Sequence, residues 1–572
     1  MPETRDPGPS VCDASAWDFA LVEEVWRRFL PLTPRGKDDK EARVVLGDRD
    51  RIEGLYDGTE AAAVAMARLD GPGRDRLSFH LGRIPRLPDA LETGLAGTLQ
   101  AIDLFLVKKY LANYRAILAL LDDGTKAAFS LTFELDALVA LLDKGGSSEE
   151  SFFIADAYDP ELASVRDRIR AADLEISRIR AEAECAAERE RGLRFCGRAF
   201  LVIPGEAARA LGTGEGKVRF LVEPHDSASC VVRIQADAGE LLATAEREGL
   251  LGEERVLESA VLARLSAAIG AEAGRIARCE RALTDFDLAR ARAVMAAEFR
   301  LSRPLLGAGR LAIAGGRLMP CETDCARLSM RYHPLDLELE ERSALIFGSN
   351  MGGKTVALQT ALCLQILAQA GLSVPADRFE TEVHARIVYA GAPRSGSPEP
   401  GRDQDGLSGF GREIDALEKA WRAAGDGGAF VVLDELGRTT SSPEAEAIVT
   451  ASAEAFAAAK GTRCMLATHF RGAAPSRAVA RLRMAGLDRG AARAHVSDAG
   501  LTQSERIRAI NGLMRYELLR EGHHGDKPRG ASDRAGESDA LEVAALLGLD
   551  EAILSGARSF YSAKHGPEGD RA

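Results

Sequence analysis

Gly348-Ser-Asn-Met-Gly-Gly-Lys354-Thr355 decides the fold of the C-terminal half of this sequence. It fits the pattern of a glycine, four residues and Gly-Lys-Ser/Thr, in which backbone N–H groups converge on phosphate oxygens. The apolar segment before it (343–347) predicts a strand, and the segment after it (355–370) predicts a helix whose N-terminus favours negative charge. Lys354 is expected to reach the β- and γ-phosphates, and Thr355 to ligate Mg²⁺. The residues expected to hold the nucleotide are Gly348, Ser349, Asn350, Met351, Gly352, Gly353, Lys354 and Thr355.

A second apolar segment ends in two adjacent acids, Ala429-Phe-Val-Val-Leu-Asp434-Glu435. Charge is costly at the end of a buried strand unless a cation or a substrate uses it. Asp434 therefore suits the Mg²⁺ shell, and Glu435 suits the orientation or deprotonation of an attacking water. The alternative is a pair of solvated acids in a turn.

One histidine follows a third apolar segment, in Ala467-Thr468-His469. A lone histidine is more often structural than catalytic. Because His469 comes one strand after the acid pair, we expect a γ-phosphate sensor. Glu435, His469 and Lys354 are thus the candidate catalytic residues, and Thr355 and Asp434 the candidate metal ligands.

Four segments together resemble the MutS family more closely than phosphate-loop enzymes at large. Asn350–Gly353 has that family's form of the loop, and Asp434–Ser441 resembles its Asp-Glu-Ile-Gly-Arg-Gly-Thr-Ser segment, with Thr439 in place of a glycine. Thr468-His469-Phe470 resembles its Thr-His-Tyr, and Ser408–Glu413 its Ser-Thr-Phe-x-x-Glu. The resemblance implies a Mg²⁺-dependent ATPase that binds ATP as a homodimer, with Ser408 completing the neighbouring subunit's site. Thr439 leaves open an assembly module with a decayed ATPase.

The rest of the chain predicts a helical core and a helical arm in front of an α/β domain. Apolar residues at three- and four-residue intervals indicate buried helical faces, and short β-rich segments indicate strands. The expected fold class is therefore mixed: an α-helical core with a protruding arm, then an α/β ABC-type phosphate-loop domain. The expected parts are a weakly ordered segment (1–40) with one helix near 16–29, a core (41–300), an arm within it (about 159–295, returning from about 253) with a tip at about 196–235, an ATPase domain (301–520), a flexible linker (521–538) and a helical end (539–572).

Composition is typical of a folded protein without membrane spans. Hydrophobic residues make up 46% and charged residues 28%, and the net charge is −13. No apolar run is long enough to cross a bilayer, and the N-terminus lacks the pattern of a signal peptide. Nine scattered cysteines without a second close pair favour reduced thiols over a zinc site. We expect a cytoplasmic protein.

The sequence departs from mismatch-repair proteins in ways that bear on function. It has no Phe-x-Glu, the element with which those proteins stack on a mispaired base, and we expect no mismatch-reading domain and no nuclease domain. Asp405–Ile414 and Ala540–Ile553 resemble the MutS-like ATPase subunit of the lysine 5,6-aminomutase reactivase. The first hypothesis is therefore an ATP-dependent chaperone that reactivates a cobalamin-dependent aminomutase, acting with a small reactivase subunit.

The alternative hypothesis is a MutS-type clamp on duplex DNA in repair or recombination. Near the arm tip lie Arg191, Arg194, Arg198 and Lys217, which could contact phosphates. Acids lie among them, so a solvated tip of mixed charge is the simpler interpretation. The arm could also be a dimerisation strut.

Overall fold

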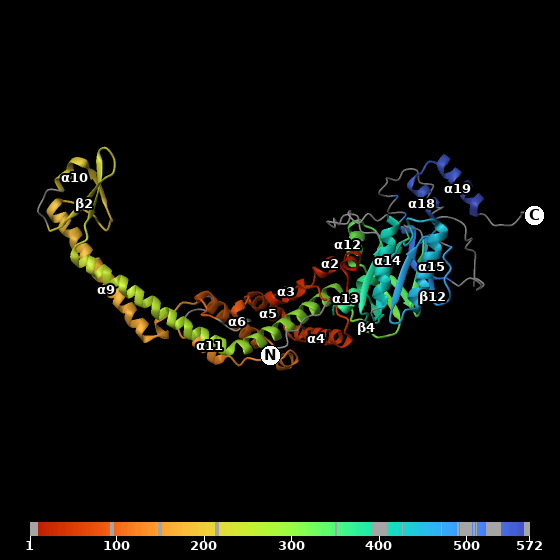
Figure 1. The fold of residues 1–572 in the computed structure, drawn as a ribbon, viewed down its shortest axis with the longest axis horizontal. Coiled ribbons are helices and arrows are strands. Elements are labelled where there is room, and N and C mark those ends of the chain that lie inside the picture. Colours follow the sequence, from red (N-terminus) through yellow and green to blue (C-terminus); the bar gives the residue numbers. More distant parts are fainter. Residues whose placement is uncertain are drawn as a thin grey trace, which may run out of the picture. The chain divides into compact units, whose positions relative to one another are not determined.

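The chain folds as two compact units of mixed helix and sheet, which confirms that part of the predicted fold class. One unit comprises residues 1–75, 122–129 and 284–572, and the other residues 76–121 and 130–283 (Figure 1). The computed structural model describes residues 10–91, 97–146, 151–211, 217–348, 352–391, 409–425, 427–470, 472–488, 491, 506, 510, 512–521 and 539–565.

The larger unit is built on a six-stranded sheet in the order β13-β12-β7-β11-β10-β9. All neighbours run parallel except β13 and β12. Helix α13 packs on one face, whereas α14 and α15 pack on the other, so apolar side chains are buried on both. The bounds are β7 (Ser343–Phe347), β9 (Arg386–Gly391), β10 (Ala429–Asp434), β11 (Arg463–Thr468), β12 (Val479–Leu487), β13 (Met514–Arg520), α13 (Lys354–Gln369), α14 (Gly409–Gly425) and α15 (Ser442–Ala458).

A second, four-stranded sheet in the order β4-β8-β5-β6 lies in the same unit. Strand β6 leads directly into β7, so the two sheets are joined immediately before the phosphate loop. The remaining elements of the unit include two C-terminal helices, which pack against each other. The bounds are β4 (Leu305–Leu306), β5 (Leu311–Gly316), α12 (Met319–Arg327), β6 (Leu335–Leu339), β8 (Arg378–Thr381), α4 (Arg49–Arg68), α7 (Asp123–Ala128), α18 (Asp539–Leu547) and α19 (Glu551–His565).

Residues 10–41, the N-terminal strap, are ordered, so the prediction of weak order is wrong for them. The expected helix near 16–29 is two helices, α1 (Ala14–Phe19) and α2 (Val22–Trp26), because Leu21 between them adopts a left-handed φ of 57°. Helix α3 (Pro34–Glu41) follows. The prediction failed because this order comes from distant contacts rather than from local periodicity.

The clearest of these contacts is Asp287, a fully buried carboxylate on α11 (Ala238–Phe299). One of its oxygens accepts bonds from the backbone N–H groups of Leu32 and Thr33, each at 2.7 Å, and from the Thr33 hydroxyl at 2.9 Å. The other accepts from the Arg290 guanidinium at 2.8 and 3.0 Å. The strap is therefore fastened to the last part of α11 by a buried, fully paired charge.

The smaller unit carries an antiparallel helix pair, α9 (Pro160–Arg191) and the first part of α11, with a small tip at its far end (Figure 1). Arg166 on α9 bonds Glu254 and Glu258 on α11 and Asp156, each within 2.8 Å. The tip is the sheet β1-β3-β2 with helix α10. The bounds are α5 (Gly71–Arg83), η1 (Asp89–Leu91), α6 (Ala101–Leu120), α8 (Asp136–Leu142), η2 (Asp156–Tyr158), β1 (Leu201–Pro204), α10 (Gly205–Leu211), β2 (Phe220–Pro224) and β3 (Ser229–Ile234).

Helix α11 begins at Ala238, about fifteen residues before the start expected from periodicity. Its first turns expose Leu241 and Leu242, so they lack the buried stripe that reveals a helix in a sequence. Of the predicted linker, only Glu521 is among the described residues. Within the described part of the chain, no helix is both long and apolar enough to span a bilayer.

Candidate functional site

The phosphate loop lies between β7, whose five residues are all buried, and α13. Gly353 adopts a φ of +89°, and a Cβ there would lie 2.9 Å from the Tyr516 ring, so glycine is required on both counts. The Lys354 side chain is 2% exposed, and its ammonium donates to the Gly348 carbonyl at 2.7 Å. Ser349, Asn350 and Met351 lie outside the described residues.

Lys354 carries a charged group although the residue is almost fully buried. Burial lowers the pKa of its ammonium, while Glu435 and Asp434 oppose that shift. An anionic phosphate at the loop would add to the favourable charge that Glu435 and Asp434 supply, because a buried ammonium is stabilised by nearby negative charge.

The structure brings Thr355 and Asp434 together at the end of β10. The Thr355 hydroxyl donates to one oxygen of Asp434 at 3.0 Å. The other oxygen, Oδ1, is buried and has no hydrogen-bond partner among the residues that the structure describes. Burial is the main cause that raises the pKa of Asp434; Glu435 adds to it, and Thr355 and Lys354 oppose it.

The Thr355 hydroxyl and the Asp434 carboxylate are suitable ligands for a hard divalent cation. Mg²⁺ prefers hydroxyl and carboxylate oxygens and usually keeps other positions for water and substrate phosphates. In the described parts of the chain, no group of three or more His, Cys, Asp or Glu residues could form a metal site built from protein alone. Asp434 Oδ1 has no hydrogen-bond partner among the described residues and lies beside the Thr355 hydroxyl. This is a suitable pair of ligands for a Mg²⁺ ion that also binds phosphate oxygens.

Glu435 is held in a backbone conformation that side chains rarely adopt, with a φ of +54°. Its N–H donates to the Ala467 carbonyl at 3.1 Å, which fixes it beside the end of β11. Non-glycine residues pay about 1–2 kcal/mol for this region, so the geometry is imposed by its surroundings. His469, one residue after β11, is exposed, and no bond between it and Glu435 appears among the described contacts.

The loop after the acids is clamped by Glu413 at the start of α14. One oxygen of this carboxylate accepts from the Gly437 N–H and the other from the Thr439 hydroxyl, both at 3.0 Å. Thr439 thus bonds Glu413 rather than crowding the acid pair. Ser408, the expected contact to a neighbouring subunit, lies outside the described residues.

Sequence reasoning missed two aromatic groups beside this site. The rings of His333 and Tyr516 lie 5.3 Å apart, and Tyr516 lies against Gly353 of the phosphate loop. Tyr389 on β9 pairs in register with Val432 of β10, two residues before Asp434. No local pattern marks either group, because Tyr389 and Tyr516 are placed by the pairing of their strands and His333 by its contact with Tyr516.

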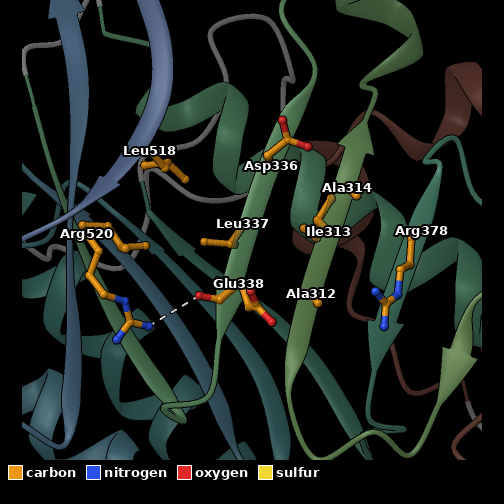
Figure 2. A pocket seen from close by; sticks show the side chains of 10 residues that line it. Ala312, Ile313, Ala314, Asp336, Leu337, Glu338, Arg378, Leu518 and Arg520 are labelled. Atoms are coloured by element: carbon orange, nitrogen blue, oxygen red, sulfur yellow. Dashed lines mark hydrogen bonds between the residues drawn. The ribbon is translucent and has the colours of Figure 1, made fainter.

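A hollow of ≈ 450 Å³ lies elsewhere in the larger unit, at the join of the two sheets (Figure 2). Its charged rim is already paired: Arg520 donates to the Glu338 carbonyl, as Figure 2 shows, and bonds Glu341, while Glu338 bonds Arg310. None of the predicted site residues lines it. The lining residues are Ala312, Ile313, Ala314, Asp336, Leu337, Glu338, Arg378, Leu482, Leu518 and Arg520.

Comparison with known proteins agrees with this geometry. Residues 344–487, which contain the phosphate loop and the acid pair, match the family model MutS domain V. Over these residues the chain is similar to the MutS family.

Named relatives show how far the similarity extends. The chain is 27% identical to "Endonuclease MutS2" of Pelotomaculum thermopropionicum, over 72% of this chain and 47% of the relative. It is 28% identical to "DNA mismatch repair protein MutS" of Natronomonas pharaonis, over 79% and 52%, and 28% identical to that of Thermus aquaticus, over 94% and 58%. The chain thus spans about half the length of the curated relatives it matches.

Proposed function

We propose that this chain is a MutS-family, Mg²⁺-dependent ATPase that uses ATP to control its binding to duplex DNA. The observation that supports hydrolysis is the pair Thr355–Asp434, in which one buried carboxylate oxygen has no hydrogen-bond partner among the residues that the structure describes. Such an arrangement costs stability in the free protein and gains its partner only when a cation binds.

Each residue of the site has a role that follows from its chemistry. Lys354 binds the β- and γ-phosphates, and its burial strengthens that attraction. Thr355 and Asp434 hold Mg²⁺, which neutralises charge that develops on the phosphate oxygens. Glu435 accepts the proton of the attacking water, and His469 contacts the γ-phosphate. The His333–Tyr516 pair beside Gly353 offers the base an aromatic surface.

Two observations support DNA as the client: the names of the relatives, and the cationic residues near the end of the arm. The relatives named above are called mismatch repair proteins or an endonuclease. A helical arm with a small tip offers Arg191, Arg194, Arg198 and Lys217 near its end. Arg194 pairs with Glu188 at 2.6 Å, so contact with a phosphate would compete with that ion pair. We further propose a homodimer in which Ser408 contacts the ATP of the partner.

A protein client is the second candidate, because the tip mixes both charges. Its specific form, a reactivase that acts with a small subunit on a cobalamin-dependent aminomutase, rests on resemblance in Asp405–Ile414 and Ala540–Ile553. The relatives named above favour DNA over this client.

The experiment is the ATPase rate of the purified chain alone, with perfect, mismatched and branched duplex DNA, and with a cobalamin-dependent aminomutase. Glu435→Gln is the control: it should bind ATP and lose turnover. If four tip cations contact phosphates, log Kd should change with log salt with a slope of about 4, and Arg198→Ala should lower that slope by about 1. Stimulation by the aminomutase alone would overturn the DNA client, and unchanged turnover in Glu435→Gln would overturn the catalytic assignment.

A further inference from the structure

Tyr389 lies beside the catalytic acids although it belongs to another strand. Strand β9 pairs with β10 so that Gly391 is opposite Asp434. The Tyr389 hydroxyl folds over Gly391, where a Cβ would collide with it and would lie 3.1 Å from the Asp434 carbonyl oxygen. Burial raises the pKa of Tyr389, and the charges of Asp434 and Glu435 raise it further, as their proximity requires.

The other side of the Tyr389 ring faces the N-terminal strap. Phe19 stacks on it with ring centroids 3.9 Å apart and planes 13° from parallel. The strap also follows the edge of β9, because Ile387 donates to the Val11 carbonyl at 2.8 Å and accepts from the Asp13 N–H at 3.3 Å. Phe19 therefore packs directly on Tyr389, and the strap is bonded directly to β9.

Phe19 is fastened to the phosphate-loop helix as well. The Gln359 side chain, five residues after Lys354 on α13, donates to the Phe19 carbonyl at 2.9 Å in a buried place. The strap thus touches two elements beside the proposed nucleotide site: β9, which pairs with the strand that carries Asp434, and α13, which starts at the phosphate loop.

The far end of the strap is fastened to α11. Asp287 holds Leu32 and Thr33 by three bonds, and Arg290 adds a bond to the Leu30 carbonyl at 3.2 Å. Between the two ends, Trp17 and Trp26 pack edge to face at 5.3 Å. The segment is packed at both ends and in the middle, so it transmits displacement rather than absorbing it.

We infer that the N-terminal strap connects the nucleotide site to α11, and that Tyr389 is the positioning residue through which the acid pair acts on it. The inference rests on the proposed function, because ATP and Mg²⁺ at Asp434 are the perturbation. A cation held by Asp434 would shift the end of β10, Tyr389 would follow through Gly391 on the paired strand, and Phe19 would pass the shift along the strap to Asp287.

The chain provides its own reporter for a test. Of its three tryptophans, Trp17 and Trp26 lie in the strap and Trp421 lies on α14. In Trp421→Phe protein, fluorescence reports the strap alone. We expect Mg²⁺ and ATP to change this fluorescence with a saturation curve that matches ATP binding measured by calorimetry.

Three substitutions in the Trp421→Phe protein interrupt the proposed connection between Tyr389 and the N-terminal strap. Phe19→Leu and Tyr389→Leu remove the stack, and Tyr389→Phe removes only the hydroxyl, which leaves the fold least disturbed. An aromatic pair shifts an equilibrium constant by about two- to tenfold, so the ATP-induced amplitude should fall at least about twofold in the two leucine variants. Tyr389→Phe keeps the stack, so any fall in its amplitude measures the part played by the hydroxyl. Phe379→Leu is the matched control, since Phe379 is fully buried in the same core.

The readouts separate the inference from the proposed function. Exchange of backbone amides at 284–299 should slow on ATP binding in the parent protein and change less in the three variants, whereas calorimetric ATP affinity stays within about threefold. Unchanged amplitude and exchange in the variants, or no ATP effect on the strap of a protein that binds ATP, would overturn the inference and leave the proposed function standing. A parent protein that binds no ATP would overturn both.

Discussion

His384 is expected to make the larger unit sensitive to acid. The residue lies between β8 and β9 and is 1% exposed. Its Nδ1 lies 3.1 Å from the Gly461 carbonyl, and its Nε2 is buried without a partner among the described residues. Burial lowers the pKa of His384 to about 4, although Glu382 and the bond to Gly461 oppose the shift.

The magnitude follows from the difference between the folded and unfolded pKa values. Below pH 6.5 the unfolded chain binds a proton on this ring, whereas the folded chain does not bind it until about pH 4. The free energy of unfolding is therefore unaffected above pH 6.5 and falls as the pH drops from 6.5 towards 4. The full loss is about 3 kcal/mol, and about 2 kcal/mol is already lost at pH 5.

The assay is urea unfolding followed by tryptophan fluorescence, because all three tryptophans lie in the same unit as His384. His384→Gln should flatten the dependence between pH 7.5 and 5 by about 2 kcal/mol relative to the parent. His225→Gln, at an exposed histidine in the other unit, is the control and should leave the curve unchanged. Equal slopes for the parent and His384→Gln would refute the reasoning.

Three further predictions concern the strap and the site. Asp287→Asn should cost about 3–5 kcal/mol in urea unfolding because Arg290 loses its buried partner, whereas Asp167→Asn at an exposed pair should cost less than about 1 kcal/mol. Thr355→Val should lower kcat/KM by about 100-fold or more in steady-state assays but keep calorimetric binding of ATP without Mg²⁺; equal loss of both would contradict a metal role. His333→Ala should weaken ATP binding about tenfold and leave pyrophosphate inhibition unchanged, and parallel losses would argue against base stacking.

Local patterns were sufficient for the centre of the site. The strand predicted over residues 343–347 has the bounds of β7, and Asp434 ends β10 as expected. A buried strand and a glycine turn are specified by adjacent residues, so the sequence carries them directly. The two motifs also place Thr355 and Asp434 on the same side of the sheet, because Asp434 ends β10 and Thr355 lies at the start of the helix that follows the loop after β7.

Contacts set by sheet register could not be predicted in this way. Tyr389 and Asp434 are forty-five residues apart, and only the order β10-β9 places them together. The strap was misread for the same reason: its charged residues suggest weak order, and the partner that orders it, Asp287, lies far along the chain. The sequence also could not show that the Thr439 hydroxyl bonds Glu413, because a motif comparison does not place these two residues together.

Because Glu435 has a left-handed backbone conformation, a substitution that raises thermal stability at this position is expected to lower activity. Glycine at this position would remove a penalty of about 1 kcal/mol and would also remove the group proposed to accept the proton. Selection for thermal stability alone would therefore favour variants with glycine at this position, which are expected to be inactive. Engineering of this protein for hot conditions needs a turnover screen in every round, because the gain in melting temperature and the proposed loss of function arise from the same residue.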